Sequence, residues 1–185
     1  MIIAIYGKSG SGKTFLADKL ASDLPNAIHI DLDEINRELM LTDDVVAEAN
    51  KIFKNTNVLS TQQLDANLIL NAIMHDEQMY TDWTNFMKSL CTNFVINYID
   101  NTNYDIYIID HLNAGILNLN NSTIYIECML DKDARMQRLN QQNFVSEEIL
   151  DFRDSKYISH PPTLVYNNTN YEDILQYISQ LYNTK

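Results

Sequence analysis

A short apolar run at residues 2–6 (IIAIY) leads directly into a glycine-rich octapeptide, GKSGSGKT, at residues 7–14. The octapeptide fits the pattern G-x-x-x-x-G-K-[ST] at every fixed position. Behind it, apolar residues recur at helical spacing from Phe15 to Leu24, and Pro25 ends that helix. A buried strand, a glycine loop and a helix in this order predict the start of an α/β fold whose loop wraps a phosphate group.

The octapeptide supplies several kinds of phosphate contact. Glycine allows backbone conformations that a side chain would forbid, and exposed N–H groups at a helix N-terminus supply positive potential. We expect Lys13 to reach the β- and γ-phosphates and the Thr14 hydroxyl to ligate Mg²⁺. ATP and Mg²⁺ are therefore the predicted cofactors. The predicted nucleotide-binding residues in this segment are Gly7, Lys8, Ser9, Gly10, Ser11, Gly12, Lys13, Thr14 and Phe15.

Strands and helices alternate along the rest of the 185 residues, a length that suits one domain. Their alternation predicts a mainly parallel sheet covered by helices on both faces. The helical stretch at residues 42–101, interrupted by a polar, turn-like segment at 55–62, is expected as a substrate-binding insertion after the second strand. Residues 131–145 are expected to form a lid. The five predicted strands lie near residues 2, 27, 105, 124 and 164.

The charge of the chain constrains its partners. A net charge of −12 and a pI near 4.5 argue against a nucleic-acid partner or an anionic membrane surface. No segment approaches the roughly 18 uninterrupted apolar residues of a membrane span, and the leading apolar run is too short for a signal peptide. We therefore expect a cytoplasmic protein, monomeric or a small homo-oligomer, that acts on a small molecule.

Acidic residues end the second and third predicted strands, at the sheet edge where parallel α/β folds bind ligands. Asp31 and Asp33 share one strand face, so one could accept the proton of an acceptor hydroxyl while the other holds Mg²⁺ through water. Asp110 is expected as a second carboxylate near the metal. The alternatives are a helix N-cap with solvated acids for Asp31 and Asp33, and a turn cap for Asp110.

A phosphate loop alone does not name a reaction, because kinases, GTPases, ATPases and transporters all use one. A GTPase would need a guanine-reading Asn/Thr-Lys-x-Asp, whereas HLNAG and MLDKD follow the third and fourth strands. The small size and the helical insertion favour a small-molecule kinase.

Several blocks, in order along most of the chain, resemble dephospho-CoA kinase, a branch of the P-loop nucleoside and nucleotide kinases. After the phosphate loop come HIDLDEINREL (residues 29–39) and LNAIMH (residues 70–75). The strand that ends at Asp110, a helix with Arg135 and Arg138, and LVYNN at residues 164–168 follow. The resemblance implies transfer of the ATP γ-phosphate to the ribose 3′-hydroxyl of dephospho-CoA.

The resemblance also implies roles for single residues. Asp33 would be the catalytic base, with Arg37 and His75 near the substrate. Arg135 and Arg138 would lie on the lid helix and stabilise the transferring phosphoryl group, and Asn168 would lie on the adenine side. From the residues alone, the lid role is favoured for the two arginines, with paired surface charges as the alternative, and His75 could equally be an ordinary histidine.

Three departures from the family pattern keep the acceptor open. Asp76 stands where the family has proline, the loop at residues 111–118 lacks the family's proline and glutamate, and Gln142 replaces a second lid arginine. A nucleoside or nucleoside monophosphate kinase is the alternative enzyme. A nucleotide-binding protein without efficient transfer is the alternative from another class.

Overall fold

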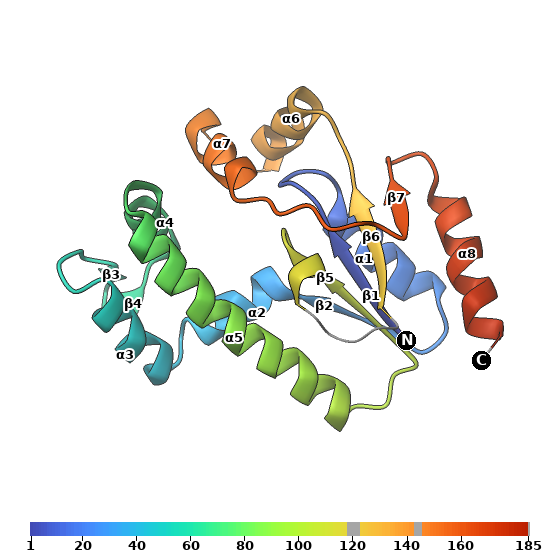
Figure 1. Ribbon diagram of the computed structural model, residues 1–185, viewed down its shortest axis with the longest axis horizontal. Helices are drawn as coiled ribbons and strands as arrows, with labels where there is room; N and C mark the ends of the chain where they lie inside the picture. The colour runs from blue at the N-terminus through green and yellow to red at the C-terminus, as the bar shows by residue number, and fades with distance from the viewer. Residues whose placement is uncertain (118–122, 143–145, 185) are drawn as a thin grey trace. The chain divides into compact units, whose positions relative to one another are not determined.

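The computed structural model describes residues 1–117, 123–142 and 146–184 (Figure 1). The chain divides into two compact units, Met1–Asp31 with Tyr98–Lys185, and Leu32–Asn97. Most of the predicted insertion at 42–101 falls in the second unit, which also takes in the helix before it. That the two units act together as one kinase domain stays a prediction.

The first unit is built on a five-stranded sheet with the order β2-β5-β1-β6-β7. Every neighbouring pair is parallel, so the predicted α/β architecture with a five-stranded parallel sheet is confirmed. At the carboxyl end of the sheet, Asp31 of β2 lies opposite Asp110 of β5. The strands are β1 (Ile2–Tyr6), β2 (Ala27–Asp31), β5 (Ile106–Asp110), β6 (Thr123–Cys128) and β7 (Leu164–Tyr166).

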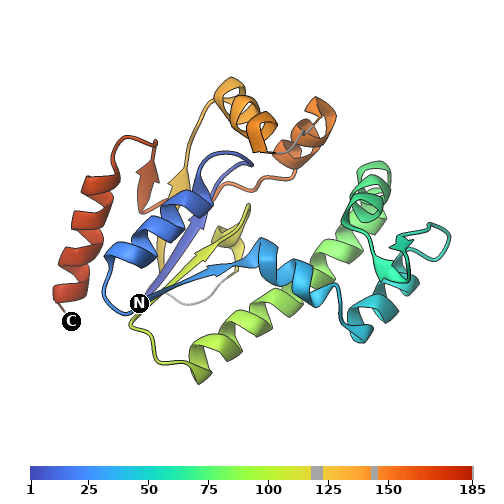
Figure 2. The ribbon, with the colours of Figure 1, turned by 180° about the vertical axis from the view of Figure 1, so that it is seen from behind.

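Helices flank this sheet. The alternating isoleucines of β1, β5 and β6 pack with α1 (Lys13–Asp23) and α8 (Tyr171–Asn183) into one buried core, with both helices on the same face (Figure 2). The described residues after β5 and β6 form the 3-10 helix η1 (Ala114–Ile116), then α6 (Lys132–Gln142) and α7 (Glu147–Ser155). In the predicted lid, residues 143–145 and the Gln142 side chain lie outside the described residues, as does Asn118 of the loop at 111–118.

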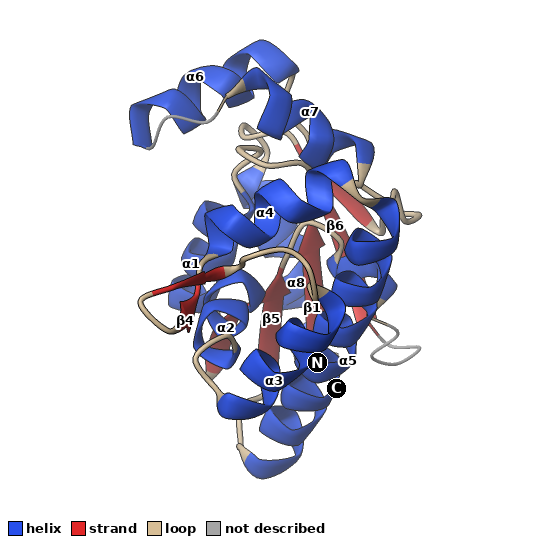
Figure 3. Cartoon of the chain, turned by 90° about the vertical axis from the view of Figure 1, so that its left-hand side faces the viewer, coloured by secondary structure: helices blue, strands red, loops and turns tan. Residues whose placement is uncertain are grey.

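The second unit is almost entirely helical (Figure 3). Its core gathers around Phe53 and Trp83, whose ring centroids lie 5.5 Å apart. Within the segment predicted as a turn, two very short strands pair antiparallel. Its elements are α2 (Leu32–Leu39), α3 (Asp43–Ile52), β3 (Leu59–Ser60), β4 (Gln63–Leu64), α4 (Ala66–His75) and most of α5 (Glu77–Asn101).

The two cysteines are buried free thiols, one in each unit. Burial raises the pKa of Cys128 to about 12, and burial together with the Asp33 carboxylate raises that of Cys91 to about 11. Across the described ranges, no helix is both long enough and apolar enough to span a membrane.

Candidate active site

The glycine loop, residues 7–14, joins β1 to the first turn of α1. Gly10 and Gly12 have φ angles of +79° and +98°, which favour glycine. A Cβ on Gly12 would lie 2.9 Å from the Asn168 side chain, and one on Gly10 would lie 3.0 Å from the Arg135 carbonyl oxygen. The tight loop therefore requires glycine at both positions, because neighbouring elements press against it. The N-terminus of α1 carries no side-chain cap, so its N–H groups suit an anion.

A pocket of about 510 Å³ opens beside this loop in the first unit. It brings together seven residues singled out from the sequence: Gly10, Gly12, Lys13, Thr14, Phe15, Arg138 and Asn168. The Phe15 ring is 62% exposed, which leaves a face on which a flat base can stack. Leu139 and Tyr166 also line the pocket, and no sequence signal distinguished them from ordinary core residues.

Arg138 and Asn168 meet at the rim of this pocket. The Arg138 Nη1 donates to the Asn168 Oδ1 over 3.1 Å, which ties α6 to the turn after β7. Asn168 has a φ of +70°, a conformation that asparagine tolerates better than most residues. The Asn168 amide also lies 3.5 Å from the backbone carbonyls of Ser11 and Met129. Asn168 is thus held by contacts from three directions.

Thr14 and Asp110 form the oxygen-rich part of the site. The Thr14 hydroxyl donates to the Asp110 Oδ2 over 2.8 Å, and Asp110 is only 2% exposed. Mg²⁺ prefers such oxygen ligands and commonly keeps water and phosphate ligands besides one or two from the protein. Within the described residues, no group of three or more His, Cys, Asp or Glu side chains could hold a metal. Thr14 and Asp110 therefore fit a Mg²⁺ ion that nucleotide phosphates help to bind.

His29 connects Asp110 to the outer face of α1. Its Nδ1 lies 2.8 Å from the Asp18 Oδ1, and its Nε2 lies 3.2 Å from the Asp110 Oδ1, outside hydrogen-bond geometry. Burial lowers the pKa of His29, but the Asp110 and Asp18 carboxylates together raise it by more, so the net shift is upward. A charged imidazole suits both neighbours, because only the protonated ring has two N–H donors. No role was assigned to His29 from the sequence; its spacing two residues before Asp31 was the available signal.

Arg135 lies on α6, the predicted lid helix, but it does not line the pocket beside the glycine loop. Its side chain is 2% exposed, and its guanidinium donates to both carboxylate oxygens of Asp154 on α7, over 3.0 and 2.6 Å. The alternative of a paired surface charge is wrong for Arg135, because its side chain is buried; its partner Asp154 is 14% exposed. A guanidinium committed in this way does not line the pocket, so among the described residues Arg138 is the lid-helix arginine that does.

The residues predicted for the acceptor side all belong to the second unit. Asp33 and Arg37 lie on α2, where both are exposed. His75 ends α4, and its Nδ1 lies 2.8 Å from the Asn71 carbonyl oxygen one turn back. Their role toward a substrate stays a prediction.

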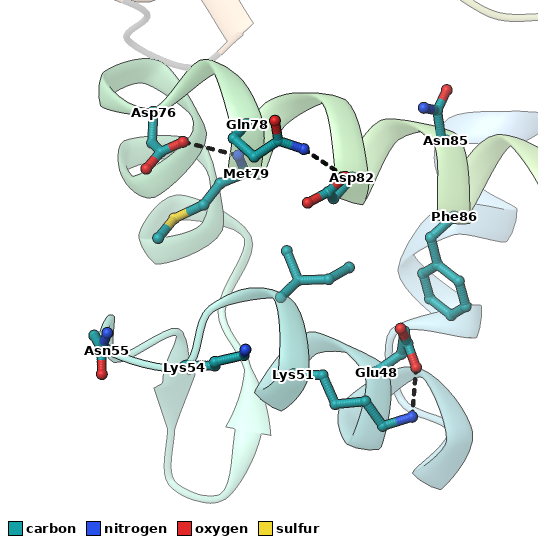
Figure 4. Close-up of a pocket in the computed structure, with 11 residues that line it drawn as sticks. Glu48, Lys51, Lys54, Asn55, Asp76, Gln78, Met79, Asp82, Asn85 and Phe86 are labelled. Atoms are coloured by element: carbon teal, nitrogen blue, oxygen red, sulfur yellow. Dashed lines mark hydrogen bonds and ion pairs between the residues drawn. The ribbon is translucent and has the colours of Figure 1, made fainter.

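A second pocket, of about 630 Å³, lies within the second unit between α3 and the start of α5 (Figure 4). Five of its eight polar side chains interact with near neighbours: Lys51 with Glu48, Gln78 with Asp82, and Asp76 with the Met79 backbone N–H. None of the residues predicted to bind nucleotide, metal or substrate or to act in catalysis lines it. The pocket beside the glycine loop is therefore the better candidate for chemistry.

Comparison with known proteins adds the fold family. No protein-family profile matches the chain. Protein translocase subunit SecA of Cyanidium caldarium is 36% identical over 77 residues, which is 42% of this chain and 9% of SecA. The chain therefore matches only a small part of the length of that relative.

Solved structures match the whole chain at low identity. TT1252 of Thermus thermophilus has a TM-score of 0.75 at 15% identity, covering 100% of this chain and 98% of its own. Dephospho-CoA kinase of Campylobacter jejuni has a TM-score of 0.54 at 18% identity, with 99% and 96% covered. Shikimate kinase of Bacteroides thetaiotaomicron has a TM-score of 0.53 at 17% identity, with 99% and 98% covered. The chain thus has the P-loop kinase fold predicted from its motifs.

Proposed function

We propose that this protein is a kinase that transfers the γ-phosphate of ATP to a hydroxyl of a nucleotide-like small molecule, with the 3′-hydroxyl of dephospho-CoA as the first candidate. The observation that carries the proposal is the contact of 2.8 Å between Thr14 and Asp110. It lies beside Lys13, at the carboxyl end of the parallel strands. A hydroxyl, a buried carboxylate and a lysine at the start of a helix are the groups that phosphoryl transfer requires on its nucleotide side.

The nucleotide would be held along its whole length by the first unit. Backbone N–H groups of the glycine loop and Lys13 would bind the β- and γ-phosphates. Thr14, with Asp110 and Asp31 at the same sheet edge, would hold Mg²⁺, which when bound neutralises charge on the phosphate oxygens. Phe15, Arg138 and Asn168 would surround the base and the sugar.

The acceptor side of the proposal rests on α2 and α4. Asp33 would take the proton of the acceptor hydroxyl, whose oxygen then bonds to the γ-phosphorus while the bond from that phosphorus to ADP breaks. Arg37 and His75 would orient the acceptor, since a guanidinium pairs well with phosphate oxygens. Asp33 and Arg37 are both exposed to solvent, which supports this assignment.

The test is release of ADP, measured in a coupled assay with Mg²⁺ and ATP. The acceptors are dephospho-CoA, nucleosides and nucleoside monophosphates, supplied one at a time. We expect dephospho-CoA to stimulate ADP release most, with the new phosphate on the ribose 3′-oxygen. Stimulation by a nucleoside or a nucleoside monophosphate alone would identify that compound as the acceptor in place of dephospho-CoA. Stimulation by none of them would contradict the kinase assignment.

A nucleotide-binding protein without efficient transfer is the second candidate. The observation in its favour is the commitment of Arg135 to Asp154, which leaves Arg138 to serve the described pocket. Calorimetry separates the two candidates. Tight ATP binding that Asp33→Asn leaves unchanged, together with no turnover on any acceptor, would favour this candidate over the kinase.

A further inference from the structure

One carboxylate on α7 gathers two cations that come from different parts of the first unit. Asp154 accepts from both terminal nitrogens of Arg135 on α6, and its Oδ2 also lies 3.6 Å from the Lys8 Nζ of the glycine loop. The Arg135 Nη1 donates a further hydrogen bond, of 3.0 Å, to the backbone carbonyl oxygen of Ser9. A buried arginine therefore joins α6 and α7 to the backbone of the glycine loop.

Stability alone is a poor explanation for this pair, in which Arg135 is buried and Asp154 is 14% exposed. Removing two charges from water is costly, and well-packed apolar side chains in their place are often as stable or more stable. A guanidinium–carboxylate fork does fix direction, because its two parallel hydrogen bonds hold the planar group in one orientation. The other N–H of the Arg135 Nη1 is thereby aimed at the Ser9 carbonyl oxygen, while the buried Nε has no hydrogen-bond partner among the described residues.

That oxygen belongs to the Ser9–Gly10 peptide, which precedes a glycine with a positive φ. Gly10 has a φ of +79° and lines the nucleotide pocket, and glycine can adopt other backbone conformations at little cost. In a planar trans peptide the C=O and the N–H point in opposite directions. A Ser9 carbonyl held toward Arg135 therefore turns the Gly10 N–H away from Arg135.

We propose that Arg135 is a positioning residue that, oriented by Asp154, fixes the Ser9–Gly10 peptide so that the Gly10 N–H is presented to phosphate. This inference rests on the proposed binding of a nucleoside triphosphate by the loop. Arg135 acts on the phosphates through the backbone and does not touch them. The close packing supports this role, since a Cβ on Gly10 would lie 3.0 Å from the Arg135 carbonyl oxygen and 3.3 Å from the Arg135 Cβ.

The test replaces the pair by apolar side chains in the double variant Arg135→Met with Asp154→Leu. The affinities of ATP, inorganic triphosphate and adenosine are measured by calorimetry, and the melting temperature is measured without ligand. We expect ATP and triphosphate to bind about tenfold more weakly, as loss of one oriented donor to a charged ligand would produce. Adenosine affinity and melting temperature should change little, because adenosine has no phosphate.

Lys132→Met is the matched control. Lys132 also joins α6 to α7, through Glu147 and Asp151 at 3.2 and 2.6 Å, and no contact of its side chain with the glycine loop is found among the described residues. It should leave all three affinities unchanged. If the double variant does not fold, Arg135→Lys takes its place, because lysine keeps the charge and loses the fork.

The outcomes are distinct. Wild-type affinity for triphosphate in a folded variant would overturn the positioning role, as would an equal loss of adenosine affinity, which indicates general damage to the pocket. A wild-type protein that binds neither ATP nor triphosphate would overturn the proposed function itself, and this inference with it.

Discussion

The two units differ in how their polar side chains are held. In the first unit, side chains contact groups far away in sequence: Thr14 contacts Asp110, Arg135 contacts the Ser9 backbone carbonyl and the Asp154 side chain, and Arg138 contacts Asn168. In the second unit, most of the described polar contacts join residues within four positions of each other, such as Lys51 with Glu48. Cys91 with Asn36 is the long-range contact described there.

This difference bears on function. Long-range contacts fix side chains relative to a sheet edge, so the first unit presents its candidate nucleotide site before any ligand arrives. Local helical contacts stabilise a helix but leave its outward side chains free to adjust. The nucleotide side is thus expected to be rigid and the acceptor side adaptable. Variants in each unit should affect nucleotide binding and acceptor chemistry separately.

The largest effect is expected for Lys13→Ala. Lys13 lines the pocket, and its ammonium would contact the transferring phosphate, so turnover should be abolished and ATP should bind at least about tenfold more weakly. Steady-state ADP release and calorimetry measure the two effects. Lys88→Ala, on the exposed side of α5, is the control. Unchanged ATP affinity in Lys13→Ala would contradict a preformed phosphate site.

Asp33→Asn tests the other side of the comparison. Loss of the proposed base should lower kcat by about 10²- to 10⁴-fold, as removal of a general base typically does, with ATP affinity nearly unchanged. Glu38→Gln, an exposed acid on the same helix, should leave both quantities as in the wild type. An equal loss of ATP affinity and kcat in Asp33→Asn would indicate that Asp33 serves the nucleotide side.

Phe53→Ala asks whether the second unit can be weakened without harming the first. Phe53 is 2% exposed and packs on Trp83, so truncation should destabilise that unit by about 3–5 kcal/mol. Trp83 is the single tryptophan of the chain, and its fluorescence therefore reports unfolding of the second unit. We expect a lower fluorescence midpoint in denaturant with ATP binding preserved. Loss of ATP binding at denaturant concentrations where Trp83 fluorescence still reports a folded second unit would contradict the expectation that the second unit can be weakened without harming the first.

The same contrast explains what the sequence could and could not predict. The glycine loop, Lys13 and Thr14 form one contiguous motif between a strand and a helix, so local pattern was sufficient. Asp110 was predictable because a buried strand that ends in an acid has a defined place in a parallel sheet. These inferences needed only local spacing and a fold rule.

The Arg135–Asp154 pair and its contact with Ser9 were beyond such rules. They depend on how α6 and α7 pack against the loop. Arg135 and Ser9, for example, are 126 positions apart in the sequence. One signal existed, because Asp154 lies four residues after the buried Leu150 and so shares its helix face. An acid on an apolar face indicates a buried partner.

The antiparallel pair β3–β4 was also not predictable from the sequence. Its two strands are too short to show an alternation of apolar and polar residues.

The smallest effects are expected at two helix caps, one in each unit. Asp65 accepts from the backbone N–H groups of Asn67 and Leu68, over 2.8 and 3.1 Å, whereas Ser146 accepts from Ile149 alone, over 3.3 Å. Replacing a capping side chain by alanine typically costs about 1 kcal/mol. We expect Asp65→Ala to reach that value and Ser146→Ala to fall below it, with ATP affinity unchanged in both.

Chemical denaturation followed by Trp83 fluorescence for Asp65→Ala, and by circular dichroism for Ser146→Ala, measures these costs. Asp65→Asn is the control, because asparagine keeps a side-chain acceptor and should retain most of the stability. A loss of ATP affinity in Ser146→Ala would be informative, since α7 also carries Asp154. It would mean that the start of α7 takes part in holding Arg135 against the loop, and that the rigid nucleotide side extends to the whole of that helix.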